Sequence, residues 1–194
     1  MRRRTRGLSF YDKRNRISKH VLKEIFSLLF EIFAAVFLAA VLVFNVGMKT
    51  NVIGVSMEPT LQNGQEILIN RLIYKLLSPK KGDVIVFLPN GNENTHYYIK
   101  RVVAVPGETV QITDGKLYVD GIPEDDEVYD KMEDAGIAED EITLANDEYF
   151  VLGDNRNISE DSRSGNVGPV GRDSIYGKAW FHMGSETEGI GFIK

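Results

Sequence analysis

The chain has 194 residues, of which 43% are apolar and 26% are charged. These values are ordinary for a folded protein and exclude a disordered or collagen-like chain. The absence of cysteine excludes a disulfide scaffold, a thiol nucleophile and a thiolate metal site. The three histidines are too few and too scattered to suggest a structural zinc site; they are His20, His96 and His182.

The net charge of −5 conceals an uneven distribution along the chain. Residues 1–24 contain nine Lys or Arg but only two acidic residues, Asp12 and Glu24, so this arm carries +7 and the rest of the chain −12. A basic arm of this kind binds nucleic acid in some proteins and flanks a membrane span in others. The segment that follows favours the membrane and not nucleic acid.

Residues 25–46 form an apolar segment in which Glu31 is the only charge. A helix of this length would measure about 33 Å, enough to cross a hydrocarbon layer of about 30 Å. A buried core helix rarely follows so basic an arm, and a cleaved secretory signal is disfavoured because no A-x-A-like site follows Phe44. We predict a basic arm over 1–24 and a transmembrane signal anchor over 25–47.

The basic residues also predict the orientation of this anchor. After the apolar segment, Lys49 is the only basic residue before Arg71. The positive-inside rule therefore places the basic arm in the cytoplasm. Residues 48–194 would then lie on the outer face of a membrane that the chain crosses once.

Residues 48–194 have the pattern of a mostly β domain built from antiparallel sheets. Short runs rich in β-branched and aromatic residues recur between turn residues, at 66–70, 83–88, 97–105, 109–113, 116–120, 148–152 and 174–181. The pair Asp114-Gly115 between two of these runs predicts a hairpin, because both residues tolerate positive φ. Residues 71–77 have a short helical pattern, and their apolar side chains would either close the β core or contact the bilayer surface.

Residues 124–141 differ from the rest of the domain because ten of them are acidic and only Lys131 is basic. We interpret this segment as a solvated, partly mobile surface excursion. It falls within a small inserted β portion at about 110–148. A calcium site is the alternative, but the spacing of the carboxylates does not match an EF-hand loop.

A first segment with side chains suited to catalysis is 52–61, where Ser56 lies between Gly54 and Pro59. A serine is a poor nucleophile unless a base lies beside it and donors await the oxyanion. Taken alone, a serine in this setting is more often a turn former than a nucleophile.

A second segment, 97–108, contains a lysine within an apolar strand. By the two-residue period of a strand, Lys100 shares a face with Tyr98, Val102 and Ala104. Burial against that face would lower the pKa of the amine from about 10.4, and a neutral amine is a competent general base. The alternative is a lysine whose amine reaches solvent at a sheet edge, as Arg101 shows that this strand accepts cations.

A third segment, 150–171, places a dense set of polar side chains after an apolar strand. Such a loop either holds an ion-paired network that fixes a site or is a surface loop of turn residues. The residues alone favour neither interpretation.

Together the three segments resemble the bacterial type I signal peptidases, a family of membrane-anchored Ser-Lys proteases. SMEPTL resembles the nucleophile box of that family, GDVIVF and YYIKRVVAVPGE resemble its strand and lysine boxes, and GDNRNISEDSR resembles its last signature loop. GPVG and IYGKAWF resemble its terminal part, so the likeness runs from about Val52 to Phe181. The single anchor and compact size are similar to those of the Gram-positive-style members.

The resemblance implies a role for each matching residue. Ser56 would be the nucleophile, Lys100 the general base and Ser159 the hydroxyl that orients the lysine amine. A supporting polar network would be formed by Asp154, Arg156, Asp161 and Arg163. Small apolar substrate pockets would be lined by Val52, Met57, Leu61, Tyr98 and Ile99. The Ser56 amide would be one oxyanion donor, and Gly54 stands where some members supply a serine hydroxyl as the second.

The resemblance also implies an activity: a serine endopeptidase of the bacterial cell membrane that removes N-terminal signal peptides from exported preproteins through an acyl-enzyme. Its partners would be signal peptides and the lipid bilayer, and it would need neither a metal nor an organic cofactor. One alternative is a self-cleaving Ser-Lys repressor, which would carry a DNA-binding helix-turn-helix where this chain has an anchor. The other is a non-catalytic membrane-anchored binding module, against which the presence of both Ser56 and Lys100 argues.

Overall fold

A computed structural model describes residues 19–89, 96–124, 129–184 and 189–193. Most of the predicted basic arm, residues 1–18, and part of the acidic segment, residues 125–128, lie outside the described residues. The chain divides into two compact units, Met1–Val41 and Leu42–Lys194.

The long helix α1 runs from Lys19 to Val46, so it begins before residue 25 and includes the end of the basic arm. Its stretch Lys19–Phe44 is long and apolar enough to cross a membrane, judged by length and composition, and none of it is buried within the protein. The core helix of a soluble protein would bury one apolar face. The helix is therefore compatible with the predicted anchor.

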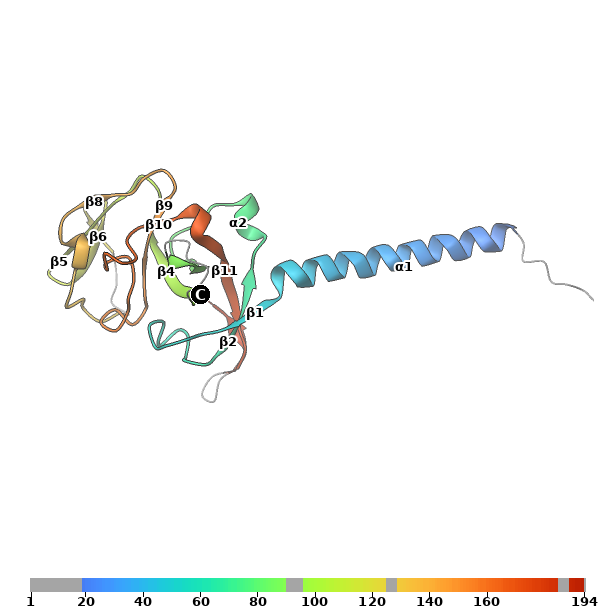
Figure 1. Cartoon of the computed structure of the whole chain (residues 1–194), viewed down its shortest axis with the longest axis horizontal. Coiled ribbons are helices and arrows are strands. Elements are labelled where there is room, and N and C mark those ends of the chain that lie inside the picture. The colour runs from blue at the N-terminus through green and yellow to red at the C-terminus, as the bar shows by residue number, and fades with distance from the viewer. Residues whose placement is uncertain (1–18, 90–95, 125–128, 185–188, 194) are drawn as a thin grey trace, which may run out of the picture. The chain divides into compact units, whose positions relative to one another are not determined.

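Within the described part of the chain, eight strands form the larger sheet of the second unit, in the order β1-β2-β11-β3-β4-β9-β10, with β12 paired to β11. Figure 1 labels β1, β2, β4, β9, β10 and β11 of this sheet. Neighbouring strands in this sheet are antiparallel. The strands are β1 (Met48–Asn51), β2 (Glu66–Asn70), β3 (Val84–Phe87), β4 (Tyr98–Ala104), β9 (Glu148–Leu152), β10 (Val170–Gly171), β11 (Ile175–His182) and β12 (Gly191–Phe192). A short helix, α2 (Ile73–Leu76), links β2 to β3, and the 3-10 turn η3 (Arg172–Ser174) precedes β11.

A second, four-stranded sheet has the order β7-β6-β5-β8. It is formed by β5 (Thr109–Thr113), β6 (Lys116–Val119), β7 (Ile122–Pro123) and β8 (Ile142–Thr143), and the 3-10 turn η2 (Gly136–Glu139) precedes β8. The expected hairpin joins β5 to β6, where Asp114 and Gly115 have φ of 53° and 74°. The mostly antiparallel β fold that the sequence predicts is therefore confirmed.

The larger sheet buries apolar side chains on both faces at β3, which lies in its middle. Val84 and Val86 pack into one hydrophobic cluster together with Met57 of the loop after β1. Ile85 and Phe87 point to the opposite face and pack into another cluster. Because β3 is fully buried, it gives the neighbouring strand β4 a fixed support.

The described part of the acidic segment, residues 129–141, has exposed carboxylates and two buried apolar residues. Met132 and Ala138 are buried against the second sheet, and the Met132 amide donates a 3.1 Å hydrogen bond to the carbonyl of Gly115. The exposed carboxylates agree with the predicted solvated surface excursion, whereas Met132 and Ala138 fasten the segment to the second sheet, and its mobility stays a prediction. Apolar residues interrupt the carboxylates at intervals of three and are packed inward, with Ala135 between the two.

Candidate active site

Ser56 lies in the loop that follows β1, and the loop after β9 forms hydrogen bonds with the backbone of this loop. The backbone amide of Asn155 donates to the carbonyl of Ser56 over 3.1 Å, and Asn155 Nδ2 donates to the carbonyl of Val55 over 3.3 Å. Gly54 has a φ of 87°, a left-handed conformation that favours glycine. These contacts fix the direction in which the Ser56 side chain leaves the loop.

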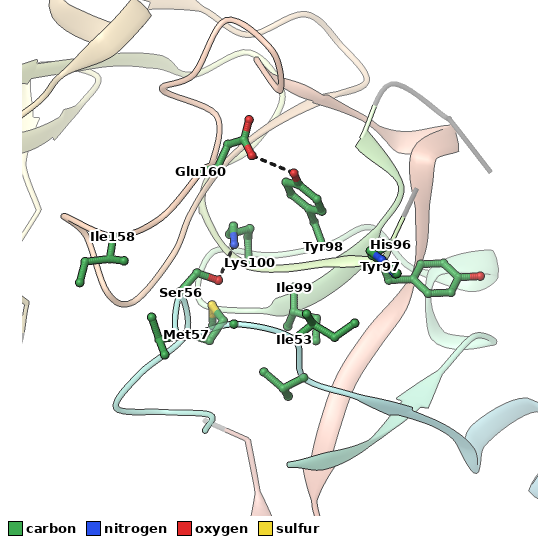
Figure 2. A pocket seen from close by; sticks show the side chains of 13 residues that line it. Ile53, Ser56, Met57, His96, Tyr97, Tyr98, Ile99, Lys100, Ile158 and Glu160 are labelled. Atoms are coloured by element: carbon green, nitrogen blue, oxygen red, sulfur yellow. Dashed lines mark hydrogen bonds between the residues drawn. The ribbon is translucent and has the colours of Figure 1, made fainter. Parts of the chain in front are cut away.

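Lys100 lies in β4, and its Nζ is 2.6 Å from Ser56 Oγ (Figure 2). Its side chain is enclosed by the protein, and the residue is only 4% exposed. The Nζ atom also lies 5.4 Å from the centre of the Tyr98 ring, as expected for residues on one face of a strand. Two residues 44 positions apart in sequence are thus brought into direct contact.

The surroundings of Lys100 lower the pKa of its amine from 10.5 to about 8, and burial is the main cause. The nearby carboxylates of Asp161, Glu160 and Asp154 oppose this shift, while the guanidinium of Arg163 adds to it. An amine with a pKa of about 8 is partly neutral at weakly alkaline pH. In that form its lone pair can accept the Ser56 hydroxyl proton.

Asp154 forms a buried, bidentate ion pair with Arg101 of β4. The Nε and Nη2 atoms of Arg101 donate to the two carboxylate oxygens over 2.8 and 2.7 Å, and Nη1 donates to the carbonyl of Gly82 over 2.9 Å. The pair joins the loop after β9 to the strand that carries Lys100. The sequence analysis missed Arg101 as a site residue, although a charged side chain within a buried strand was itself a signal.

Asp161 and Arg163 form the second ion pair of the loop, with Arg163 Nε and Nη2 donating to the carboxylate over 2.8 and 2.9 Å. The amide of Gly153 donates to Asp161 Oδ2 over 3.1 Å. Arg163 also donates to the carbonyls of Arg156 and Asp134, the latter over 3.1 Å. Of the two interpretations of this loop, the structure contains the ion-paired network.

Arg156 is almost completely buried, and its guanidinium carbon lies 4.2 Å from the centre of the Tyr129 ring. This contact joins the loop after β9 to the segment that precedes η2. It contributes a cation–π attraction in a place from which water is excluded.

Gly153 lies where the loop after β9 passes close to Ser56. A Cβ atom at this position would lie 2.2 Å from Ser159 Oγ and 2.5 Å from the carbonyl oxygen of Ser56. Within the described residues, Ser159 Oγ is buried and has no hydrogen-bond partner, so the expected bond to Lys100 is not formed in this structure. The sequence analysis did not single out Gly153 as a site residue.

A pocket of about 380 Å³ opens beside Ser56 and Lys100 (Figure 2). Of the residues predicted to line substrate pockets, it is lined by Val52, Met57, Tyr98 and Ile99. Leu61 is not among the lining residues but is fully buried in the hydrophobic cluster that contains Val52 and Met57. Lining residues that the sequence analysis did not predict are Ile53, Val55, His96, Tyr97, Ile158 and Glu160.

One edge of β4 is open next to this pocket. On one side, β3 pairs with β4 from Arg101 through Tyr98. On the other side, the pairing with β9 stops where Leu152 faces Arg101. Residues 98–100 therefore lack a strand neighbour on the β9 side among the described residues, and an extended peptide can pair there.

A serine hydroxyl in contact with a buried amine, beside an apolar pocket and an open strand edge, can carry out acyl transfer on a peptide. Fold and site together thus define a candidate peptidase of the Ser-Lys type.

Comparison with known proteins agrees with this class. The family model described as "Signal peptidase, peptidase S26" matches residues 24–183. Signal peptidase IB of Staphylococcus aureus is 35% identical over 149 residues, which cover 67% of this chain and 74% of that protein. A probable signal peptidase I-2 of Synechocystis is 35% identical over 129 residues, which cover 64% of this chain and 57% of that protein.

Among solved structures, a signal peptidase I from Enterococcus faecalis is similar with a TM-score of 0.39 and 31% identity, over 53% of this chain and 97% of that chain. The family model covers most of the chain, so the chain belongs to the signal peptidase family, peptidase S26. It is a serine peptidase, and the family resemblance and the enzyme class predicted from the sequence are confirmed.

Proposed function

We propose that this chain is a membrane-bound endopeptidase that removes N-terminal signal peptides from exported preproteins through a Ser56-Lys100 dyad and an acyl-enzyme. The observation that carries this proposal is the 2.6 Å separation of Ser56 Oγ and Lys100 Nζ. It is supported by the burial that lowers the pKa of the lysine to about 8 and by the family to which the chain belongs.

The reaction begins when the neutral Lys100 amine accepts the Ser56 hydroxyl proton and Oγ attacks the scissile carbonyl carbon. The resulting ammonium then donates its proton to the leaving amine as the C–N bond breaks, leaving the substrate acyl group as an ester on Ser56. In the second half, Lys100 accepts a proton from a water molecule that attacks the ester. As the ester bond breaks, the Lys100 ammonium returns its proton to Ser56 Oγ, which releases the acid product and restores both the hydroxyl and the neutral amine.

The backbone amide of Ser56 is the proposed first donor to the oxyanion. Gly54 has no hydroxyl to offer as a second donor, and its amide already donates to Asn63 Oδ1 over 2.9 Å. We therefore expect the second hydrogen bond to come from another backbone amide or from water.

The substrate binds as an extended segment along the open edge of β4. Side chains of an extended peptide alternate between two faces, so the first and third residues before the cut point to the same face. On one face of β4, Ile99 packs with Val52 and Met57 in one cluster, and these three also line the pocket. Small residues at the first and third positions fit this shallow apolar wall.

The helix α1 serves as the membrane anchor, and the positive-inside rule applied to the basic residues at its start supports a cytoplasmic N-terminus. Under this proposal the bilayer is a partner of the protein, and residues 48–194 work on its outer face. Preproteins that emerge there present their signal peptides to the site.

The test is turnover of a signal-peptide substrate by the full chain in detergent. Ser56→Ala and Lys100→Ala should each reduce kcat/KM by at least about a thousandfold. Ser78→Ala and Lys116→Ala are matched controls at exposed positions and should keep full activity. Mass spectrometry during turnover should detect the substrate acyl group on Ser56. Substantial turnover by folded Ser56→Ala would overturn the proposal, and peptide binding without turnover by the unaltered chain would favour a binding module.

A further inference from the structure

The pocket beside the catalytic pair contains one acidic group among its described lining residues, Glu160. Its side chain is exposed, and its Oε2 accepts a 2.9 Å hydrogen bond from the hydroxyl of Tyr98. Figure 2 shows Glu160 and Tyr98 on one side of the Ser56–Lys100 pair and the apolar side chains of Met57 and Ile53 on the other. The pocket therefore has an apolar side and an acidic side.

The alternation of side chains along a strand decides which substrate residue faces each side. Ile99 of β4 lies on the apolar side with Met57, whereas Tyr98 packs against the cluster on the other face of the sheet and contacts Glu160. A peptide that continues the sheet at the edge of β4 alternates in the same way. If its first and third residues before the cut lie on the apolar side, its second residue lies beside Tyr98 and Glu160.

We propose that Glu160 is a specificity residue that favours a basic side chain, Lys or Arg, at the second substrate position before the cut. The inference deepens the proposed function and rests on it, because it uses the same substrate direction and the same strand edge. It names a substrate class within signal peptides: those that carry a cation at this one position.

The charges at the pocket suit a cation. The hydrogen bond from Tyr98 occupies Oε2, and within the described residues Oε1 of Glu160 accepts no hydrogen bond, so it can receive one from a substrate amine or guanidinium. Lys100 is the one described lysine or arginine that lines the pocket, and it is neutral when it acts as the base. An exposed ion pair of this kind changes affinity by about two- to fivefold, and exchanging a cation for an anion adds repulsion to lost attraction.

The test compares three signal-peptide substrates that differ only at the second position before the cut, with Lys, Gln or Glu. Measurements at pH 9 keep Lys100 mostly neutral and the substrate lysine charged. For the unaltered full chain, kcat/KM should be at least about fivefold higher for the Lys substrate than for the Glu substrate. The ratio should fall in 0.5 M salt, which screens exposed charges.

The ratio should approach one in Glu160→Gln and invert in Glu160→Lys. Glu139→Gln is the matched control, since it removes another exposed carboxylate from η2 and should keep the ratio of the unaltered chain. Using ratios removes any effect of a variant on overall rate or on the amount of folded protein. An unaltered chain without a Lys preference, or a preference that survives Glu160→Gln, overturns this inference. In either case the proposed function is judged separately, by the loss of turnover in Ser56→Ala.

Discussion

At the scale of single residues, the environment of Lys100 sets the conditions under which the site can work. Burial lowers the pKa of its amine, and the neighbouring carboxylates limit that shift, leaving it at about 8. A surface lysine, with a pKa near 10.4, would be almost fully protonated at neutral pH. Under the proposed mechanism, removing water from one lysine supplies the base that many serine peptidases obtain from histidine.

The pH dependence of the reaction follows directly. Below a pH of about 8 the Lys100 ammonium cannot accept the Ser56 proton, so kcat/KM should rise with pH through about 8 and then level off. Initial rates measured between pH 6 and 10 give this rise of kcat/KM with pH, the acid limb of the profile. Lys100→Arg should be inactive, since a guanidinium keeps its proton in this range.

Histidine is the competing cause of such a limb, because an unperturbed imidazole titrates near about 6.5. His96→Ala and His182→Ala should therefore leave the limb in place. The Ser-Lys assignment would fail if the limb vanished with either histidine, or if folded Lys100→Arg retained substantial turnover.

Gly153 gives a second prediction at this scale. In Gly153→Ala the added methyl would meet Ser159 Oγ at 2.2 Å and the Ser56 carbonyl at 2.5 Å, so the nucleophile loop must shift. Since misplacement by about 1 Å can cost about a hundredfold in rate, kcat should fall by about that factor. Gly165→Ala is the control, because its Cβ would meet nothing within 4 Å. Equal activity of the two variants would contradict the close packing described here.

The contact between Ser56 and Lys100, 2.6 Å apart in the structure, could be expected from sequence only through the resemblance of three segments together to the signal peptidases, because neither the serine pattern nor the lysine pattern is distinctive alone. The ion pair between Arg101 and Asp154 could not. Its partners are 53 positions apart, and neither residue has a neighbour that points to the other. Its existence depends on β9 ending at Leu152, beside Arg101, which is a property of the sheet as a whole.

At the scale of elements, the sequence predicted the long β-branched runs well and the short strands poorly. The run at 66–70 is β2 and the run at 148–152 is β9. The strands that were missed have two to four residues, as in β1 with the polar sequence MKTN and β10. Such strands form because an existing edge supplies their hydrogen bonds, and sequence periodicity does not record that edge.

The short helix α2 has buried residues that close the β core and exposed residues that leave the predicted bilayer contact open for residues 71–77. Ile73 and Tyr74 pack into the core, whereas Leu76 and Leu77 are 85% and 57% exposed. The register of β1 with β2 places Met48 opposite Ile69, so α2 follows β2 at the end of the sheet where the chain arrives from Val46. If α1 spans a bilayer, Leu76 should contact its surface.

The absence of cysteine from the chain allows a direct measurement of this contact. A fluorescent label on Leu76→Cys in the full chain, reconstituted in vesicles with anionic lipid, should be quenched by quenchers attached to the lipid. The same label on Ile122→Cys, at an exposed position of β7, should be quenched much less. Equal quenching at both positions would restrict α2 to its role in the core.

At the scale of the whole molecule, the charge distribution of the sequence predicts the topology. Nine basic residues lie within residues 1–24, before the apolar segment, whereas the chain after that segment is strongly acidic. Protease added to intact spheroplasts should digest residues 48–194 and spare the arm, as antibodies against tags at the two ends would show. Disrupted spheroplasts are the control, in which both ends should be digested. Protection of the catalytic part in intact spheroplasts would reverse the orientation.

Arg163 joins the loop after β9 to the segment at η2, which packs against the second sheet, and this junction affects how the protein unfolds on heating. Arg163 donates to the carbonyl of Asp134, while its own carbonyl accepts a 2.9 Å hydrogen bond from the amide of Ile137. Neither side of this junction can open without releasing backbone groups of the other. The two sheets should therefore melt in one cooperative transition, and activity should disappear with it, without an earlier phase in which the second sheet has melted but the enzyme still works.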